Sequence, residues 1–154
     1  MFSNKYIYIY TTIMVVAVAA LLALAATLLK PFQDKNARVE TMQNILKAAG
    51  IASTAEDAEA LYVGRIREEL TVNAGGEVLA RYGSDGALLD GAGARAFDIS
   101  MKNALEAGEE GAFPVFVCRK DGEDGYIVPL YGKGLWGPIW GYITFAPDMN
   151  TVLG

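Results

Sequence analysis

The first strong pattern along the chain is an uninterrupted apolar run near its N-terminus. Residues 6–29 contain no charged side chain and begin with three tyrosines at alternate positions, Tyr6, Tyr8 and Tyr10. As a helix, about 24 residues span about 36 Å, which exceeds the roughly 30 Å hydrocarbon core of a bilayer. Tyrosine rings favour the membrane interface, and Lys30-Pro31 adds a charge and a helix breaker at the far end. We predict one transmembrane helix over 6–29, with residues 1–5 as its N-terminal flank.

Two other interpretations of this run stay open. Ala23-Leu24-Ala25 resembles a signal-peptide cleavage site, although the run is about twice as long as the usual apolar region of a signal peptide. A pilin-like stem would also begin with an apolar helix, but the acidic residue expected near its start is missing. Membrane orientation is undecided by the positive-inside rule, because the few charges that flank the two ends differ little in number. They are Lys5 and the terminal amine on one side, and Lys30, Lys35 and Arg38 on the other, with Asp34 among them.

Beyond the run, the apolar spacing changes to that of an amphipathic helix. Between Lys35 and Ala49 the apolar positions recur every three or four residues, and Gly50 stands where a left-handed C-terminal cap falls. This predicts a linker helix within residues 30–50. Ser53-Thr54-Ala55-Glu56 fits a capping box, which predicts a second helix from Thr54 to about Tyr62.

The remaining pattern, over residues 51–154, is that of one α+β domain. Alternation over 66–72 predicts a strand, 83–93 is expected to be an exposed loop, and 99–107 a short helix that ends at Gly108. The runs 114–119, 126–131 and 139–145 predict an antiparallel meander, with a turn at 121–125. A turn over 147–150 precedes Thr151-Val152-Leu153, which resembles the start of a strand, so we expect the domain to be incomplete at its C-terminal end.

Composition then excludes several chemistries. The 154 residues include no His and one Cys, so no Ser-His-Asp triad, imidazole zinc site or intrachain disulfide can form within them. From Gln33 onward 11 Lys and Arg stand against 18 Asp and Glu, a net charge of −7. Nucleic acid is therefore not an expected partner, because phosphate neutralisation needs a basic surface.

The most informative stretch is Gly132 to Tyr142, GKGLWGPIWGY, which holds both tryptophans and four glycines of the chain. Glycine lets a ligand approach the backbone, a tryptophan face can stack on a planar ring, and Lys133 can meet a phosphate. The structural alternative is a hairpin whose tryptophans fill the core. The sequence alone leaves both interpretations open.

This stretch resembles the C subunit of the bacterial sodium-translocating NADH:quinone oxidoreductase, in which GKGLW followed by a small residue and an aromatic is typical. The resemblance extends to IVPLYGKGLWG at 127–137, to the single N-terminal membrane helix and to the linker helix around NILKAAG. It implies an FMN-binding α+β domain on the outer, periplasmic side of the bacterial inner membrane. In that setting the chain would transfer electrons within a multi-subunit complex that oxidises NADH, reduces quinone and exports sodium ions.

The resemblance also implies site residues, although the match is incomplete. Gly134, Leu135 and Trp136 would line the flavin, Lys133 would assist the phosphate, and Trp140 and Tyr142 would be pocket walls or core. The family attaches FMN through a threonine in a Ser-Gly-Ala-Thr motif, which residues 1–154 lack. The covalent threonine is therefore expected beyond residue 154, and the chain alone is expected to be inactive.

Two alternative functions stay open. One is the G subunit of the related Rnf electron-transport complex, whose motif region usually lacks GKGLW. The other is a membrane-anchored binding or assembly domain without a cofactor. A Ser-Gly-Ala-Thr motif further along the parent gene would favour the flavin interpretation.

Overall fold

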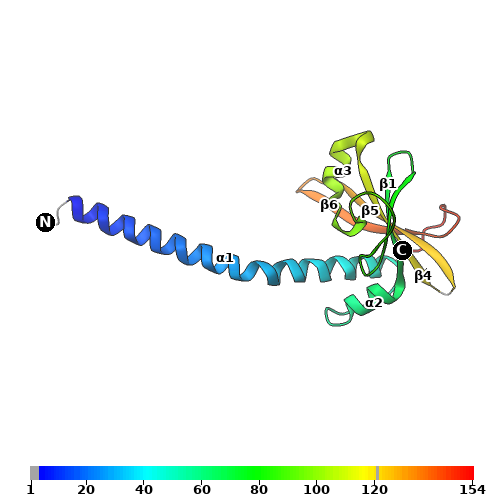
Figure 1. Ribbon diagram of the computed structural model, residues 1–154, viewed down its shortest axis with the longest axis horizontal. Helices are drawn as coiled ribbons and strands as arrows, with labels where there is room; N and C mark the ends of the chain where they lie inside the picture. The colour runs from blue at the N-terminus through cyan, green and yellow to red at the C-terminus, as the bar shows by residue number, and fades with distance from the viewer. Residues whose placement is uncertain (1–3, 121) are drawn as a thin grey trace. The chain divides into compact units, whose positions relative to one another are not determined.

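The computed structural model describes residues 4–120 and 122–154 (Figure 1). Residues 1–3 of the predicted flank and Asp121 of the predicted turn lie outside the described residues. The elements in chain order are α1 (Asn4–Ala48), α2 (Ala58–Arg65), β1 (Ile66–Asn73), β2 (Val78–Gly83), β3 (Leu88–Gly91), η1 (Ala96–Asp98), α3 (Met101–Ala107), η2 (Gly108–Glu110), β4 (Ala112–Lys120), β5 (Glu123–Lys133) and β6 (Pro138–Phe145).

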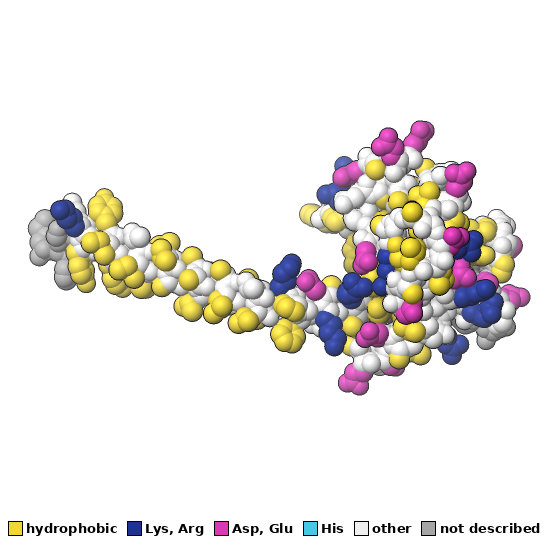
Figure 2. Space-filling model, in the orientation of Figure 1, with side chains coloured by type: hydrophobic (Ala, Val, Ile, Leu, Met, Phe, Trp, Pro, Cys, Tyr) yellow, Lys and Arg dark blue, Asp and Glu magenta, His cyan; other side chains and the backbone are white. Residues whose placement is uncertain are grey.

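The chain divides into two compact units, Met1–Arg38 and Val39–Gly154. In the first, α1 is long and apolar enough to cross a membrane, and its side chains are exposed along 4–38. Figure 2 shows hydrophobic side chains along this part of α1 and most charged side chains after it. The hydroxyls of Thr11, Thr12 and Thr27 donate to backbone carbonyls three or four residues earlier. Their polar atoms are thus satisfied within the helix, as a bilayer interior requires.

Pro31 lies inside α1. The expectation that Lys30-Pro31 ends the helix is therefore wrong. Proline removes one backbone hydrogen bond and crowds the carbonyl four residues earlier, but the bonded turns on either side keep the helix continuous. The predicted membrane segment 6–29 and the predicted linker helix within 30–50 consequently belong to one helix.

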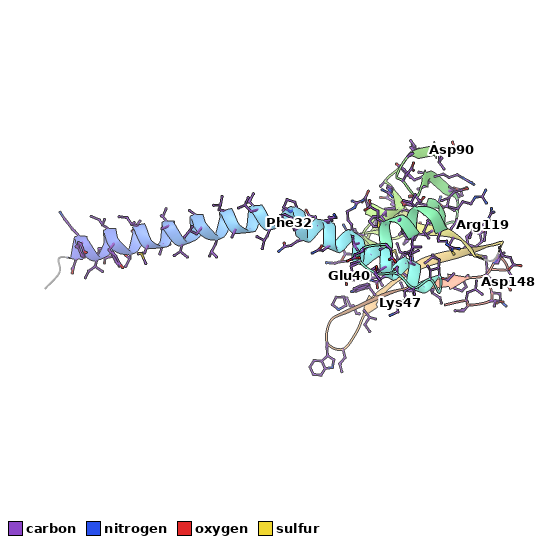
Figure 3. The ribbon with its side chains drawn as sticks, turned by 90° about the horizontal axis from the view of Figure 1, so that it is seen from below. Phe32, Glu40, Lys47, Asp90, Arg119 and Asp148 are labelled. Atoms are coloured by element: carbon purple, nitrogen blue, oxygen red, sulfur yellow. The ribbon has the colours of Figure 1, made fainter. Side chains whose placement is uncertain are left out.

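The C-terminal end of α1 is capped as the sequence predicts. Gly50 has a φ of 70°, its N–H donates to the Lys47 carbonyl, and the Ile51 N–H donates to the Leu46 carbonyl, both at 2.9 Å. This pair of bonds is the Schellman arrangement, which uses the left-handed conformation open to glycine. Glu40 and Lys47 lie on the last turns of α1 (Figure 3). The opposite side of these turns buries Met42, Ile45 and Leu46 in the core.

The second helix begins later than the capping-box prediction placed it. Residues 55–57 form a turn, and α2 starts at Ala58 with Asp57 as its N-cap residue. The carboxylate of Asp57, and not that of Glu56, accepts the Thr54 N–H at 2.6 Å. The predicted capping box is therefore wrong, because the neighbouring acid satisfies the backbone and moves the helix start.

The strands form a six-stranded antiparallel sheet in the order β3-β2-β1-β4-β5-β6. This confirms the α+β class and the predicted meander of β4, β5 and β6. One sheet face packs against the end of α1, α2 and η1. Its core cluster includes Ile45, Leu46, Tyr62, Ile66, Phe116 and Ile127.

The prediction of an exposed loop over residues 83–93 is partly wrong. It contains β3, which pairs with β2, and the sequence pattern did not predict β2 either. A tight turn with Gly86 at a φ of 87° joins the two strands. All four residues of β3 are exposed, so an edge strand of this kind carries no alternating burial pattern that a sequence could reveal.

The segment after β6 returns along that strand. Phe145 forms an isolated bridge with Val152, and the Leu153 N–H donates to the Thr144 carbonyl at 2.8 Å. The predicted strand start at 151–153 is therefore a short pairing beside β6. The predicted turn at 147–150 is confirmed, with hydrogen bonds from Asn150 and Thr151 to the Asp148 carboxylate.

Candidate functional site

The GKGLW stretch forms the turn between β5 and β6. Lys133 pairs with Pro138 at the end of the ladder, and the Gly134 N–H donates to the Gly137 carbonyl at 2.8 Å, which closes the turn. A Cβ atom at Gly134 would lie 2.6 Å from the Ile139 Cδ1 and 3.0 Å from the Gly137 oxygen. A side chain at position 134 would therefore crowd Ile139 and the backbone of the turn.

The two residues at the tip of this turn are almost fully exposed. Leu135 is 90% exposed and Trp136 is 97% exposed, and Lys133 is also exposed. A large apolar side chain with this exposure contributes nothing to the core. The alternative in which both tryptophans fill the core is therefore wrong for Trp136.

Trp140 and Tyr142 lie on β6, two residues apart, and so on one face of the sheet. Trp140 is 59% exposed and is also not a core residue. Tyr142 is half-buried and makes an edge contact with Phe116, with the ring centroids 6.5 Å apart. Burial raises the pKa of the Tyr142 hydroxyl, so this group stays protonated at neutral pH.

These two aromatic residues border a cavity of about 180 Å³. Another part of the lining comes from η1 and the start of α3, and the lining includes Phe97, Ile99, Met101, Phe116, Trp140 and Tyr142. Among the described residues that line this cavity, none is charged. The sequence pattern did not predict it, because η1 and α3 are brought to β6 only by the tertiary fold.

A second pocket lies along α3 and β5. Its lining includes Lys133 from the end of β5 and both Lys102 and Glu106 from α3. The Lys102 Nζ and a Glu106 carboxylate oxygen are 3.9 Å apart, an exposed pair that stabilises little. The structure thus adds Lys102 to the cations near the motif, a neighbour that sequence spacing does not reveal.

The wall of the cavity on the η1 side is fixed by a buried carboxylate. Glu69 on β1 is fully buried and accepts two hydrogen bonds from Arg95, from Nε at 2.8 Å and from Nη2 at 2.6 Å. The Tyr62 hydroxyl donates to it at 2.9 Å and the Phe97 N–H at 3.3 Å. The hydrogen bond to Glu69 is the main cause that raises the pKa of Arg95, so its guanidinium stays charged. This network positions Ala96 and Phe97, which line the cavity.

The six predicted site residues are therefore divided between two places. The structure puts Lys133, Gly134, Leu135 and Trp136 in the exposed turn, and Trp140 and Tyr142 at the cavity. Both places belong to one hairpin.

Comparison with known proteins gives a consistent family. No protein-family model matches the chain. The chain is 31% identical over 144 residues to the C subunit of the Na(+)-translocating NADH-quinone reductase of Haemophilus ducreyi, a match that covers 87% of this chain and 54% of that protein. It is 30% identical to the C subunit of the same reductase from Neisseria meningitidis serogroup B, over 94% of this chain and 60% of that protein.

A solved structure supports the same similarity. The crystal structure of the corresponding C subunit from Parabacteroides distasonis matches with a TM-score of 0.64 at 35% identity, over 82% of this chain and 55% of that one. The chain is therefore similar to this C-subunit family over 82% or more of its own length. All three relatives are C subunits of the sodium-translocating reductase, so they support this family and give no support to the alternative of an Rnf protein. The chain spans between about half and 60% of the length of these relatives.

Proposed function

We propose that the chain is an electron-transfer subunit of a membrane complex that oxidises NADH, reduces quinone and exports sodium ions. The relatives are named as subunits of such a reductase. The observation that carries the proposal is the exposure of Trp136 and Leu135 at the tip of the hairpin. An aromatic and an aliphatic side chain that add nothing to the core are available to contact a cofactor.

The cofactor that we propose is FMN, and the residues present fit this group. An isoalloxazine ring is planar and largely apolar, and the hairpin offers Trp136 and Leu135 without a neighbouring carboxylate in the turn. Trp140 and Tyr142 add two further aromatic surfaces. Lys133 and Lys102 are the cations that would meet the phosphate. FMN would supply the redox chemistry, while these residues would hold and orient it.

Residues 1–154 contain no Ser-Gly-Ala-Thr motif, so no residue among them is proposed as a covalent attachment point. We further propose that residues 6–29 span the bacterial inner membrane once. In this arrangement the linker helix within 30–50 leads to a periplasmic domain over 51–154. Its partners would be the other subunits of the complex and the bilayer.

The test is a titration of the detergent-solubilised chain with FMN, followed by quenching of tryptophan and flavin fluorescence. Because Trp136 is 97% exposed, Trp136→Ala should leave the melting temperature unchanged while it weakens FMN binding at least fivefold. Leu89→Ala removes a 60% exposed apolar side chain on β3 and should change neither quantity.

Equal FMN affinity in the wild-type chain and in Trp136→Ala would show that Trp136 is not part of the FMN site. Failure of FMN to bind the wild-type chain would contradict the flavin proposal for this chain. It would favour the membrane-anchored binding domain without a cofactor.

A further inference from the structure

The cavity beside Trp140 and Tyr142 has a wall that the fold holds rigidly. Phe97 forms part of this wall, and its ring contacts two groups: the Tyr62 ring, edge-on with the centroids 5.7 Å apart, and the Arg95 guanidinium, 5.4 Å from the ring centre. Both groups are hydrogen-bonded to the buried Glu69 carboxylate. The wall is thus fixed before any ligand arrives, which lowers the conformational cost of binding.

The size of the cavity selects a small ring. Its volume is about 180 Å³, and an apolar protein cavity of about 150 Å³ is known to bind benzene. One aromatic ring with two methyl groups is therefore of the right size. A three-ring isoalloxazine is too large to enter completely.

The side chains of the lining favour an apolar ring. They are mostly aromatic, aliphatic and proline, and the polar side chains among them are Thr41, the Trp140 indole and the Tyr142 phenol. The dimethylbenzene end of an isoalloxazine is apolar, whereas its pyrimidine end carries several hydrogen-bonding groups. The polar end would lose its hydrogen bonds with water in such a cavity, so it should stay outside.

We propose that this cavity binds the dimethylbenzene end of the flavin, between Phe97 and Met101 on one side and Trp140 and Tyr142 on the other. The inference rests on the proposed flavin function and assigns the orientation of the ring. Glu69 is then a positioning residue, which acts on the ring through Arg95 and Phe97.

The test uses two probes that lack the ribityl phosphate, namely o-xylene, which reproduces the dimethylbenzene end, and lumiflavin, which reproduces the whole ring system. Binding of o-xylene to the detergent-solubilised chain is measured by NMR saturation transfer, and binding of lumiflavin by fluorescence. We expect both to bind the wild-type chain. Saturating o-xylene should raise the apparent Kd of lumiflavin at least fivefold, because the two share the cavity.

Variants that fill the cavity provide a second test of the proposal. Ile99→Trp fills the cavity from the residue after η1, and Met101→Trp fills it from the start of α3. Each variant should weaken the binding of both probes at least tenfold. Leu89→Trp makes a similar change on the exposed strand β3 and should leave both affinities within twofold of wild type. Thermal melts of all variants identify any that fails to fold, and the two filling positions test the proposal independently.

Trp136→Ala separates this inference from the proposed function. This variant should weaken the binding of lumiflavin and leave the binding of o-xylene unchanged, because Trp136 is at the turn and does not line the cavity. If lumiflavin binds but neither o-xylene nor the filling variants affect it, the ring lies elsewhere, and the orientation is wrong while the flavin function stands. Absence of o-xylene binding to the wild-type chain would also overturn the inference.

Discussion

At the scale of single residues, two neighbouring glutamates on β1 have opposite environments. Glu68 is partly exposed and forms ion pairs with the exposed Arg67 and Arg81, each at 3.4 Å, while the side chain of Glu69 is fully buried and accepts four hydrogen bonds. A buried charge whose partner is removed is strongly unfavourable, whereas an exposed pair contributes little. The two positions therefore form a matched pair for mutation.

Glu69→Ala should lower the free energy of unfolding by about 3 to 5 kcal/mol, because it leaves Arg95 without its carboxylate partner in a mostly buried position. Glu68→Ala should lower it by about 1 kcal/mol or less. Denaturant unfolding of the detergent-solubilised chain measures both. Similar losses in the two variants would show that the buried network does not stabilise the domain.

Tyr62 gives a prediction about alkaline pH. Burial raises the pKa of its hydroxyl above the usual range, and the negative charge of Glu69 raises it further. The folded state therefore holds this proton more tightly than the unfolded chain does. That contribution to stability is complete below pH about 10 and decreases as the pH rises further, by up to about 1.4 kcal/mol per pH unit. Tyr62→Phe should make the decline above pH 10 shallower, and parallel curves for the two proteins would contradict the assignment.

At the scale of elements, the β5–β6 hairpin contains two glycines with different surroundings. A Cβ atom at Gly134 would approach the Ile139 side chain to 2.6 Å, while a Cβ at Gly132 would meet no atom within 4 Å. Gly134→Ala should therefore lower the free energy of unfolding by about 1 kcal/mol or more, and Gly132→Ala should leave it nearly unchanged. Hydrogen exchange of the Gly134 amide, bonded to the Gly137 carbonyl, reports the same difference locally. Equal protection of this amide in both variants would mean that Ile139 moves aside without loss.

The elements with strong local signals could be predicted from the sequence. The apolar spacing and Gly50 indicated the end of α1, and the alternating runs indicated β1 and the meander. The sequence placed the start of α2 wrongly because Asp57 and Glu56 are both possible capping acids, and only the folded turn selects between them. It missed β2 and β3 because the exposed β3 shows no alternation.

The candidate site was predicted less completely than the fold. The motif residues were found because they are contiguous in the sequence. Phe97, Lys102 and Glu69 were missed, since only the tertiary fold brings η1 and α3 to the hairpin and places Glu69 of β1 against η1. The sequence also left open whether Trp136 and Trp140 are exposed, because a tryptophan in a hairpin can lie in the core or at the surface.

At the scale of the whole molecule, the side of the membrane on which the domain lies is a direct test of the proposed function. We expect the domain to lie outside the cytoplasm, as the family resemblance implies. Alkaline phosphatase fused after Gly154 should be active in cells, and a green fluorescent protein at the same place should stay dark. Fusions to residues 39–154 without the apolar helix are the control, and should give the reverse pattern. Cytoplasmic fluorescence of the full-length fusion would contradict the proposed orientation.

The hydrogen bond from the Thr144 hydroxyl to the Ala48 carbonyl, 2.7 Å long, joins residues 96 positions apart. During synthesis the last turns of α1 emerge early, and the strand that bonds to their end emerges much later. Met42, Ile45 and Leu46 must therefore wait for β4 and β5 before their apolar surface is covered. Contacts of such long sequence separation form slowly, and the surface that they leave open favours aggregation. A nascent chain stalled before β4 should consequently depend on chaperones until the remaining strands are made.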